Sequence, residues 1–190
     1  KTGVNTLQEF VALAKSKPGA LNYGSSGIGS SHHLTMEALK AALGLDIQHV
    51  PFKGSALSVP ALIGGQVEVA FSALPSLSGF VKDNRVKLLA TNAAQRSAAA
   101  PGVPAIAELV PGFDFSVVVG VLAATGTPAA AIERISSEIE KIAKSPDTIQ
   151  TLANAGIDAV GSGPADYGRT VLAENERLAS AIKVAGIKGE

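Results

Sequence analysis

The chain has 190 residues, of which 46% are hydrophobic and 17% charged, and its 16 basic and 16 acidic residues cancel to a net charge of zero. This composition is typical of a folded globular protein and excludes both a disordered chain and the basic surface of a nucleic-acid binder. The absence of cysteine excludes disulfide scaffolds, thiol catalysis and cysteine-based zinc sites.

The first half of the chain alternates short strands with helices. Thr6 and Glu9 form a capping box for a helix that ends before Pro18-Gly19. The pattern then predicts strands at 21–23, 47–50, 67–71 and 86–90, with helices at 34–42, 55–63 and 75–81. This alternation of strands and helices implies right-handed crossover connections and a mostly parallel sheet. We therefore expect an α/β fold with ligands at the carboxyl ends of its strands.

The second half begins with a loop-like connection at 91–111 that contains a helical turn near Ile106. The stretch 115–132 carries no charge, but Gly126 and Pro128 interrupt it, so it predicts a strand at 117–122 and then a helix rather than a membrane span. Further helices begin at Pro146 and Pro164. The helix that follows Pro128 has an isoleucine face, formed by Ile132, Ile135, Ile139 and Ile142. The helix that begins at Pro164 is lined by Tyr167, Val171, Leu178 and Ile182.

The strongest candidate site is the run Tyr23-Gly-Ser-Ser-Gly-Ile-Gly-Ser-Ser-His-His-Leu34, which joins a strand to a helix. Glycine lets the backbone approach a ligand, and a helix N-terminus offers unpaired N–H groups with a partial positive charge. Serine hydroxyls add hydrogen bonds to a carboxylate or phosphate. The candidate ligand contacts in this run are Ser25, Ser26, Gly27, Gly29, Ser30, Ser31 and His33. The alternative is an ordinary serine N-cap with a glycine turn.

Two further candidates follow the neighbouring strands at the same edge of the sheet. Lys53, in the turn before Ser55, could supply a countercharge, or it could be a solvated lysine. Ser72 could contact the ligand, or it could merely cap the helix that Pro75 begins.

Common catalytic and cofactor motifs are absent. His32 stands where G-x-G-x-x-G needs its third glycine, no G-K-[ST] follows a glycine loop, and Ile28 breaks the G-x-S-x-G elbow. Adjacent side chains in a helix point about 100° apart, so His32 and His33 do not predict a metal site, and we interpret His32 as a neutral hydrogen-bonding group. We predict no cofactor and no metal. An atypical serine enzyme, a hydrolase or isomerase that uses Ser26 with His33 or His49, is the competing hypothesis.

Blocks spread along the chain resemble the tripartite tricarboxylate transporter solute receptors, the Bug family. The blocks are Lys17-Pro-Gly19, Leu21-Asn-Tyr-Gly-Ser-Ser-Gly-Ile-Gly-Ser-Ser-His-His-Leu34, His49-Val-Pro-Phe-Lys-Gly-Ser55, Gly64-Gly-Gln-Val-Glu68, Leu74-Pro-Ser76, Val103-Pro104, Pro111-Gly-Phe113 and Gly126-Thr-Pro128. They occur in the family's order, so the likeness is more specific than a single glycine loop.

The resemblance implies a type II periplasmic binding fold, in which two α/β lobes close by a hinge motion on a small carboxylate, commonly a dicarboxylate or an acidic amino acid. It implies a non-enzymatic receptor in the periplasm of a Gram-negative bacterium, not embedded in the membrane, which passes its ligand to membrane transport subunits or a sensor. No signal peptide is visible at Lys1, and family members usually continue ahead of that point, so we expect a truncated chain. Residues 1–120 would be the ligand-binding second lobe, and 121–190 the C-terminal part of the first.

Two positions depart from the family's pattern. Ser72 stands where many relatives have aspartate, and Val118 where many have tryptophan. Because a serine offers no carboxylate to a ligand amino group, we hypothesise a plain carboxylate ligand rather than an amino acid. We expect a monomer. A third interpretation is an interaction module, in which the exposed lobe interface mediates self-association.

Overall fold

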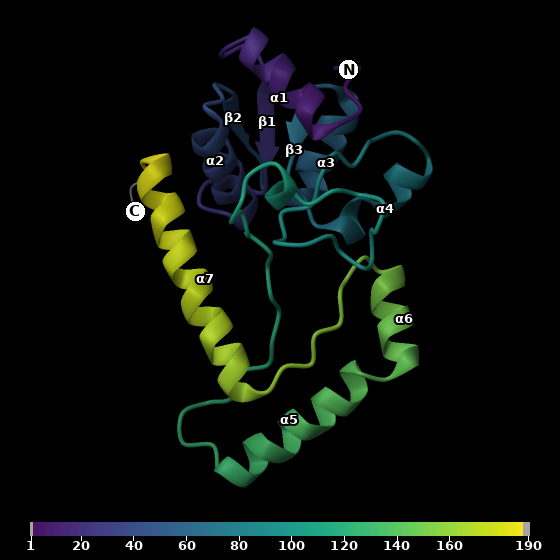
Figure 1. Cartoon of the computed structure of the whole chain (residues 1–190), viewed down its shortest axis with the longest axis vertical. Helices are drawn as coiled ribbons and strands as arrows, with labels where there is room; N and C mark the ends of the chain where they lie inside the picture. The colour runs from purple at the N-terminus through teal and green to yellow at the C-terminus, as the bar shows by residue number, and fades with distance from the viewer. Residues whose placement is uncertain (1, 188–190) are drawn as a thin grey trace.

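Three short strands form a parallel sheet in the first half of the chain (Figure 1). The computed structural model describes residues 2–187. The strands β1 (Asn22–Ser25), β2 (Gln48–Pro51) and β3 (Val69–Ala70) lie in the order β2-β1-β3, with Tyr23 opposite both His49 and Val69. This confirms the predicted α/β class, and the central strand β1 leads directly into the serine- and glycine-rich run.

Four helices surround the sheet: α1 (Leu7–Ser16), α2 (Ser31–Leu43), α3 (Ser55–Gly64) and α4 (Leu74–Lys82). Local signals set their ends as predicted. Thr6 Oγ1 accepts a hydrogen bond from the Glu9 N–H at 3.1 Å, and Gly44 ends α2 in the left-handed conformation, with φ of 63°. The hydrophobic core lies between α1, α2 and the sheet, and its largest fully buried side chains include Phe10, Tyr23, Met36 and Ile47.

Two predicted strands are wrong, and a third is shorter than predicted. Residues 86–90 are irregular, and only Thr91 forms an isolated bridge, to Ala105. The segment 117–122 has no strand partner among the described residues, and the third strand shrinks from 67–71 to Val69–Ala70. Apolar, β-branched residues suit a strand, but a strand also needs a neighbour for its backbone N–H and C=O groups. The predicted helical turn is confirmed as a 3-10 helix, η1 (Ile106–Glu108).

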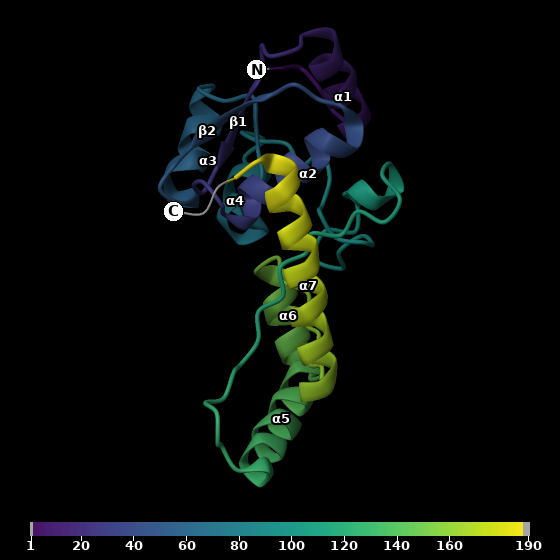
Figure 2. The same ribbon diagram turned by 90° about the vertical axis from the view of Figure 1, so that its left-hand side faces the viewer.

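Beyond Ser116 the chain extends away from the part that contains the sheet and forms a C-terminal arm, residues 117–163 (Figure 2). The arm contains the helices α5 (Ala129–Ala143) and α6 (Pro146–Asn154). The last helix, α7 (Pro164–Ala185), then runs back and packs against α2 (Figure 1). The proposed lobe division at residue 120 stays a prediction.

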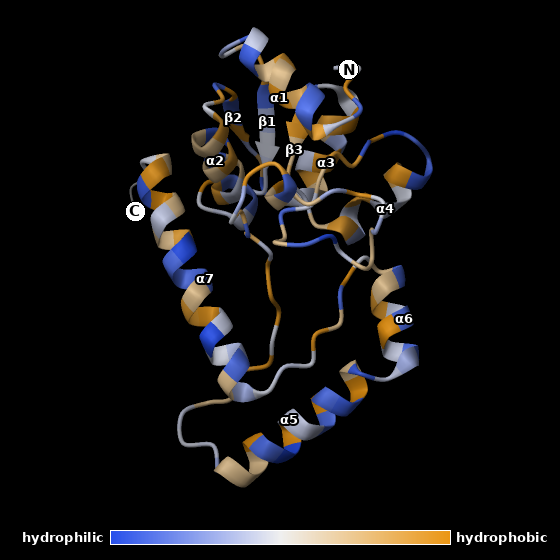
Figure 3. Ribbon diagram, viewed as in Figure 1, coloured by the Kyte–Doolittle hydropathy of each residue, from blue (hydrophilic) through white to orange (hydrophobic). Residues whose placement is uncertain are grey.

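Apolar and polar residues alternate along this arm (Figure 3), and several of the apolar side chains are exposed. Val119 is 92% exposed and Leu122 80%, and the isoleucine face of α5 is also uncovered, with Ile142 59% exposed. The sequence predicted the helix and its apolar face, but none of its four isoleucines is fully buried by the described residues. None of the helices described between residues 2 and 187 has both the length and the apolar character needed to cross a membrane.

Candidate functional site

The serine-glycine loop, residues 25–31, lies at the carboxyl end of β1 and leads into α2. Gly27 and Gly29 have φ of +130° and +75°, backbone conformations that residues other than glycine rarely adopt. Ser25 Oγ accepts a hydrogen bond from Gly27 N–H at 3.1 Å, and Ser30 Oγ donates one to Gly27 O at 2.8 Å. Ser30 also caps α2 by accepting from His33 N–H. The hydroxyls of Ser25 and Ser30 therefore shape the loop, and Ser25 is fully buried.

A second loop, residues 52–54, packs against the first. The Phe52 N–H donates to Ser25 O at 3.2 Å, and the Gly54 N–H donates to Ser26 O at 3.1 Å. The Phe52 ring lies against Gly24, where a Cβ would come within 3.3 Å of it. The two loops place Ser26 Oγ 3.3 Å from Ser55 Oγ, so Ser26, which also contacts His32 in the first turn of α2, lies beside the first residue of α3.

These two helix N-termini present unpaired donors. The N–H groups of Ser31 and His32 in α2, and of Ser55 and Ala56 in α3, have no acceptor among the hydrogen bonds of residues 2–187. The first N–H groups of a helix have no intrahelical partner, and the helix dipole makes them partly positive. The arrangement therefore favours an anion beside Ser26 and Ser55.

Three histidines stand behind the loop. The Ser26 hydroxyl contacts His32 Nδ1, whereas Ser25 Oγ lies 2.6 Å from His49 Nε2. His33 is 6% exposed, and its Nδ1 accepts from Gly29 N–H at 3.0 Å. Burial lowers the pKa of all three below the ordinary 6.5, and that of His49 to about 4, so the rings are neutral at neutral pH.

The pairs that the enzyme hypothesis requires are not formed. Ser26 contacts His32 rather than His33 or His49, and His49 pairs with the fully buried Ser25. His32, which the sequence suggested is a neutral hydrogen-bonding group, thus contacts the serine that was proposed as the nucleophile. Within residues 2–187, no group of three or more His, Asp or Glu side chains could hold a metal ion.

The remaining predicted residues lie in different environments. Lys53 is exposed in the turn before α3 and forms no ion pair with another described residue. Ser72 follows β3, and its buried Oγ has no hydrogen-bond partner among the described residues. It does not cap α4, because the N-cap is Ala73 and no side chain caps that helix. The hypothesis that Ser72 serves as a helix cap is therefore wrong.

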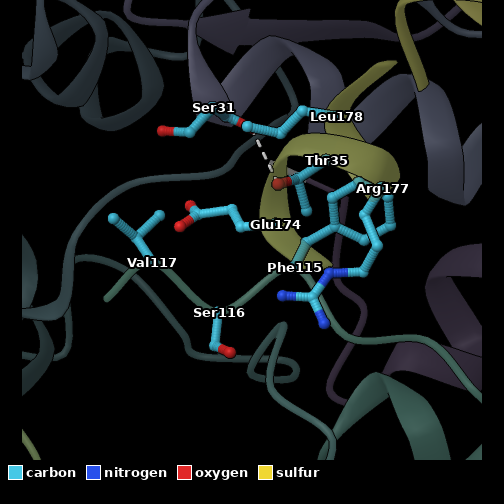
Figure 4. A pocket seen from close by; sticks show the side chains of 8 residues that line it. All are labelled: Ser31, Thr35, Phe115, Ser116, Val117, Glu174, Arg177 and Leu178. Atoms are coloured by element: carbon cyan, nitrogen blue, oxygen red, sulfur yellow. Dashed lines mark hydrogen bonds between the residues drawn. The ribbon is translucent and has the colours of Figure 1, made fainter. Parts of the chain in front are cut away.

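Ser31 lines a small cavity between α2, the segment 115–117 and α7 (Figure 4). Its other lining residues include Thr35, Phe115, Glu174 and Arg177. Sequence analysis missed Glu174 and Arg177, because nothing local indicates that a helix so late in the chain returns to the first loop. Arg177 Nη1 donates to Asp114 Oδ2 at 3.1 Å beside this cavity.

Comparison with known proteins identifies the family. Residues 1–187 match the model of the tripartite tricarboxylate transporter family receptor. A Cupriavidus necator protein, named as a UPF0065 protein in the gbd 5' region, is 35% identical over 79% of this chain and 46% of its own length. The protein BugT of Bordetella pertussis is 28% identical over 99% of this chain and 58% of its own. The chain thus spans about half the length of the curated relatives it matches.

Solved structures share the fold. An R. palustris protein solved with adipate is 31% identical, with a TM-score of 0.86 over 97% of this chain and 62% of that protein. A protein solved as a periplasmic transporter is 30% identical, with a TM-score of 0.77 over 98% of this chain and 61% of that one. A second R. palustris protein, MatC with bound malate, is 24% identical with a TM-score of 0.68 and supports the fold alone. The family resemblance and the binding-protein fold are thereby confirmed, and the chain belongs to the tripartite tricarboxylate transporter receptor family, a family of binding proteins and not of enzymes.

Proposed function

We propose that this chain holds a carboxylate group of a small organic diacid between the N-termini of α2 and α3. The observation that carries the proposal is the 3.3 Å approach of Ser26 Oγ to Ser55 Oγ, which places the loop that leads into α2 beside the first residue of α3. A carboxylate there meets hydroxyl donors and the unpaired N–H groups of Ser31 and His32. Lys53, exposed in the turn before Ser55, adds positive charge near this carboxylate.

The ligand class follows from two features. The R. palustris relative at 31% identity was solved with adipate, a linear diacid without an amino group. In this chain the end of β3 carries Ser72, a neutral group with no carboxylate to attract an ammonium ion. A plain diacid is therefore favoured over an acidic amino acid.

The biological setting follows from the family. A receptor of this kind works in the periplasm of a Gram-negative bacterium and delivers its ligand as a monomer to membrane transport subunits. The two lobes close on the ligand by a hinge motion. Residues 1–120 form the lobe that carries the serine-glycine loop.

The experiment is a titration of the ¹⁵N-labelled chain with adipate, followed by amide NMR shifts. Ser31, His32, Ser55 and Ala56 supply the unpaired donors, so their amide signals should move together and saturate. The variant Ser26→Ala should weaken binding by about 10- to 150-fold, the cost of one hydrogen bond to a charged group. The control Ser180→Ala, on the exposed surface of α7, should leave the titration unchanged. Shifts confined to other parts of the chain, or none at all, would overturn the proposal, and preference for 2-aminoadipate would overturn the ligand class.

A further inference from the structure

Three aromatic rings from three different elements form a stack directly behind the serine-glycine loop. Tyr23 of β1 lies 4.7 Å from His49 of β2, and His49 lies 4.0 Å from His33 of α2, measured between ring centroids. The two imidazole planes are inclined by only 10°. Tyr23 is fully buried, His33 nearly so and His49 partly buried, so the stack runs from the interior toward the surface.

Each imidazole is linked to one glycine of the loop, His33 directly and His49 through the Ser25 hydroxyl. His33 Nδ1 accepts the hydrogen bond from Gly29 N–H at 3.0 Å, so this nitrogen carries no proton and the ring proton sits on Nε2. His49 Nε2 contacts Ser25 Oγ at 2.6 Å, and the same hydroxyl accepts the hydrogen bond from Gly27 N–H at 3.1 Å. Gly27 and Gly29 are the positions whose positive φ values define the loop.

The surroundings disfavour charge on either ring. Two stacked imidazolium ions with centroids 4.0 Å apart would repel each other in a water-poor site. The charged groups that act on the pair are Glu37 and Lys40 of α2. Glu37 Oε1 already accepts hydrogen bonds from Tyr23 Oη at 2.5 Å and from Lys40 Nζ at 2.7 Å, so its charge is largely compensated.

We propose that His33 and His49 are positioning residues, which hold the serine-glycine loop in its anion-binding shape only while both imidazoles are neutral. Neither ring touches the ligand in this account, and the role rests on the proposed function of the loop. A proton on His33 Nδ1 would remove the acceptor of Gly29 N–H. A proton on His49 Nε2 would compel the Ser25 hydroxyl to accept from it, and the Ser25 proton would then point only to Gly27 O, 3.2 Å away.

The direction of the pKa shifts agrees with this geometry. Burial lowers the pKa of His33, and burial together with the neighbouring His33 lowers the pKa of His49 to about 4. The neutral pair, and with it the loop, should persist from alkaline pH down to mildly acidic pH.

The test is an NMR titration of the ligand-free chain, in which imidazole nitrogen shifts report the tautomer and amide shifts report the loop. At pH 7.5 His33 should show a bare Nδ1 and a protonated Nε2. As the pH falls, the amide signals of Gly27 and Gly29 should move with the midpoints of His49 and His33. A protonated Nδ1 on His33 at pH 7.5, or glycine signals that ignore both titrations, would overturn the inference.

The variant His33→Gln supplies a second measurement. It removes the ring whose charge lowers the pKa of His49 but keeps a side-chain oxygen that can accept from Gly29 N–H, so the His49 midpoint should rise. An unchanged midpoint would contradict the coupling of the two rings. If the variant does not fold, the tautomer of His33 in the unmodified chain still decides the question. Because no ligand is added, failure here differs from failure of adipate to bind.

Discussion

Arg177 Nη1 donates a hydrogen bond to Asp114 Oδ2 at 3.1 Å, and this ion pair joins the last helix to the segment 114–116, which leads into the C-terminal arm. Asp114 also accepts from Ser116 N–H at 3.1 Å and from Ser116 Oγ at 2.6 Å. Asn92 Nδ2 also donates to Phe115 O of this segment at 2.5 Å. The segment is thus held by side chains from two distant parts of the chain, beside the start of α2.

Arg177→Ala should destabilise the chain by about 1 kcal/mol, because a partly buried ion pair with a hydrogen bond is lost. The matched control is Arg169→Ala, also on α7, whose pair with Asp166 is far more exposed to solvent. The control should change the free energy of unfolding by less than about 0.5 kcal/mol. Urea denaturation measures both, and equal losses would show that the Asp114 contact does not anchor α7.

Gly120→Ala should destabilise the packing of the arm on α7. A Cβ built on Gly120 overlaps the Tyr167 ring, so either the ring or the backbone must move, at a cost of about 1–3 kcal/mol. Gly168→Ala, one residue beyond Tyr167 and in open space within α7, should instead stabilise by about 0.5–1 kcal/mol. Thermal unfolding of the two variants should therefore shift in opposite directions, and a shift in the same direction contradicts this contact.

The exposed isoleucine face of the arm should tolerate polar substitution. Ile142→Ser removes a side chain that is 59% exposed, so it should change stability by less than about 0.5 kcal/mol and should raise solubility. Ile47→Ala, in the core where the side chain is 1% exposed, should cost about 2–5 kcal/mol. A large loss for Ile142→Ser, measured by chemical denaturation, would mean that something covers α5 in solution.

Stability should fall between pH 6.5 and pH 5. The folded chain keeps His49 neutral down to a pKa of about 4, whereas an unfolded histidine takes up its proton near 6.5. The unfolded state therefore binds more protons in this window, which lowers the free energy of unfolding as the pH drops. Above pH 6.5 this contribution is complete and constant.

Denaturant midpoints at pH 7.5, 6.0 and 5.0 measure this effect, and staying above pH 5 avoids most carboxylate titration. The variant His49→Gln should show a smaller slope than the parent chain. Stability that is flat or rises as the pH falls through this range would refute the neutral state of the buried histidines.

The serine-glycine loop could be predicted because its causes are local. Two glycines with positive φ, a serine N-cap at Ser30 and a helix ended by Gly44 are all signals within a few residues of each other. The neighbouring turn before α3 was predicted for the same reason. What the sequence did not show is which hydroxyls remain available, since the buried Ser25 and the capping Ser30 bond within the loop and Ser26 turns to Ser55 and His32.

The predictions that were wrong, and the contacts that were missed, depend on residues far apart in the sequence. Segments 86–90 and 117–122 have the apolar composition of strands, but neither finds a strand neighbour among the described residues. The pairing of His49 with Ser25 depends on the register of β1 against β2, which places Tyr23 opposite His49. The Arg177–Asp114 pair joins residues 63 positions apart, and no local pattern marks it.

The central claim is that a carboxylate binds between the N-termini of α2 and α3, and a crystal structure of the chain with adipate tests it most directly. We predict one adipate carboxylate within hydrogen-bond distance of Ser26 Oγ and Ser55 Oγ and of the backbone N–H groups of Ser31 and His32. An adipate carboxylate bound elsewhere on the chain, with these donors left to solvent, would contradict the claim.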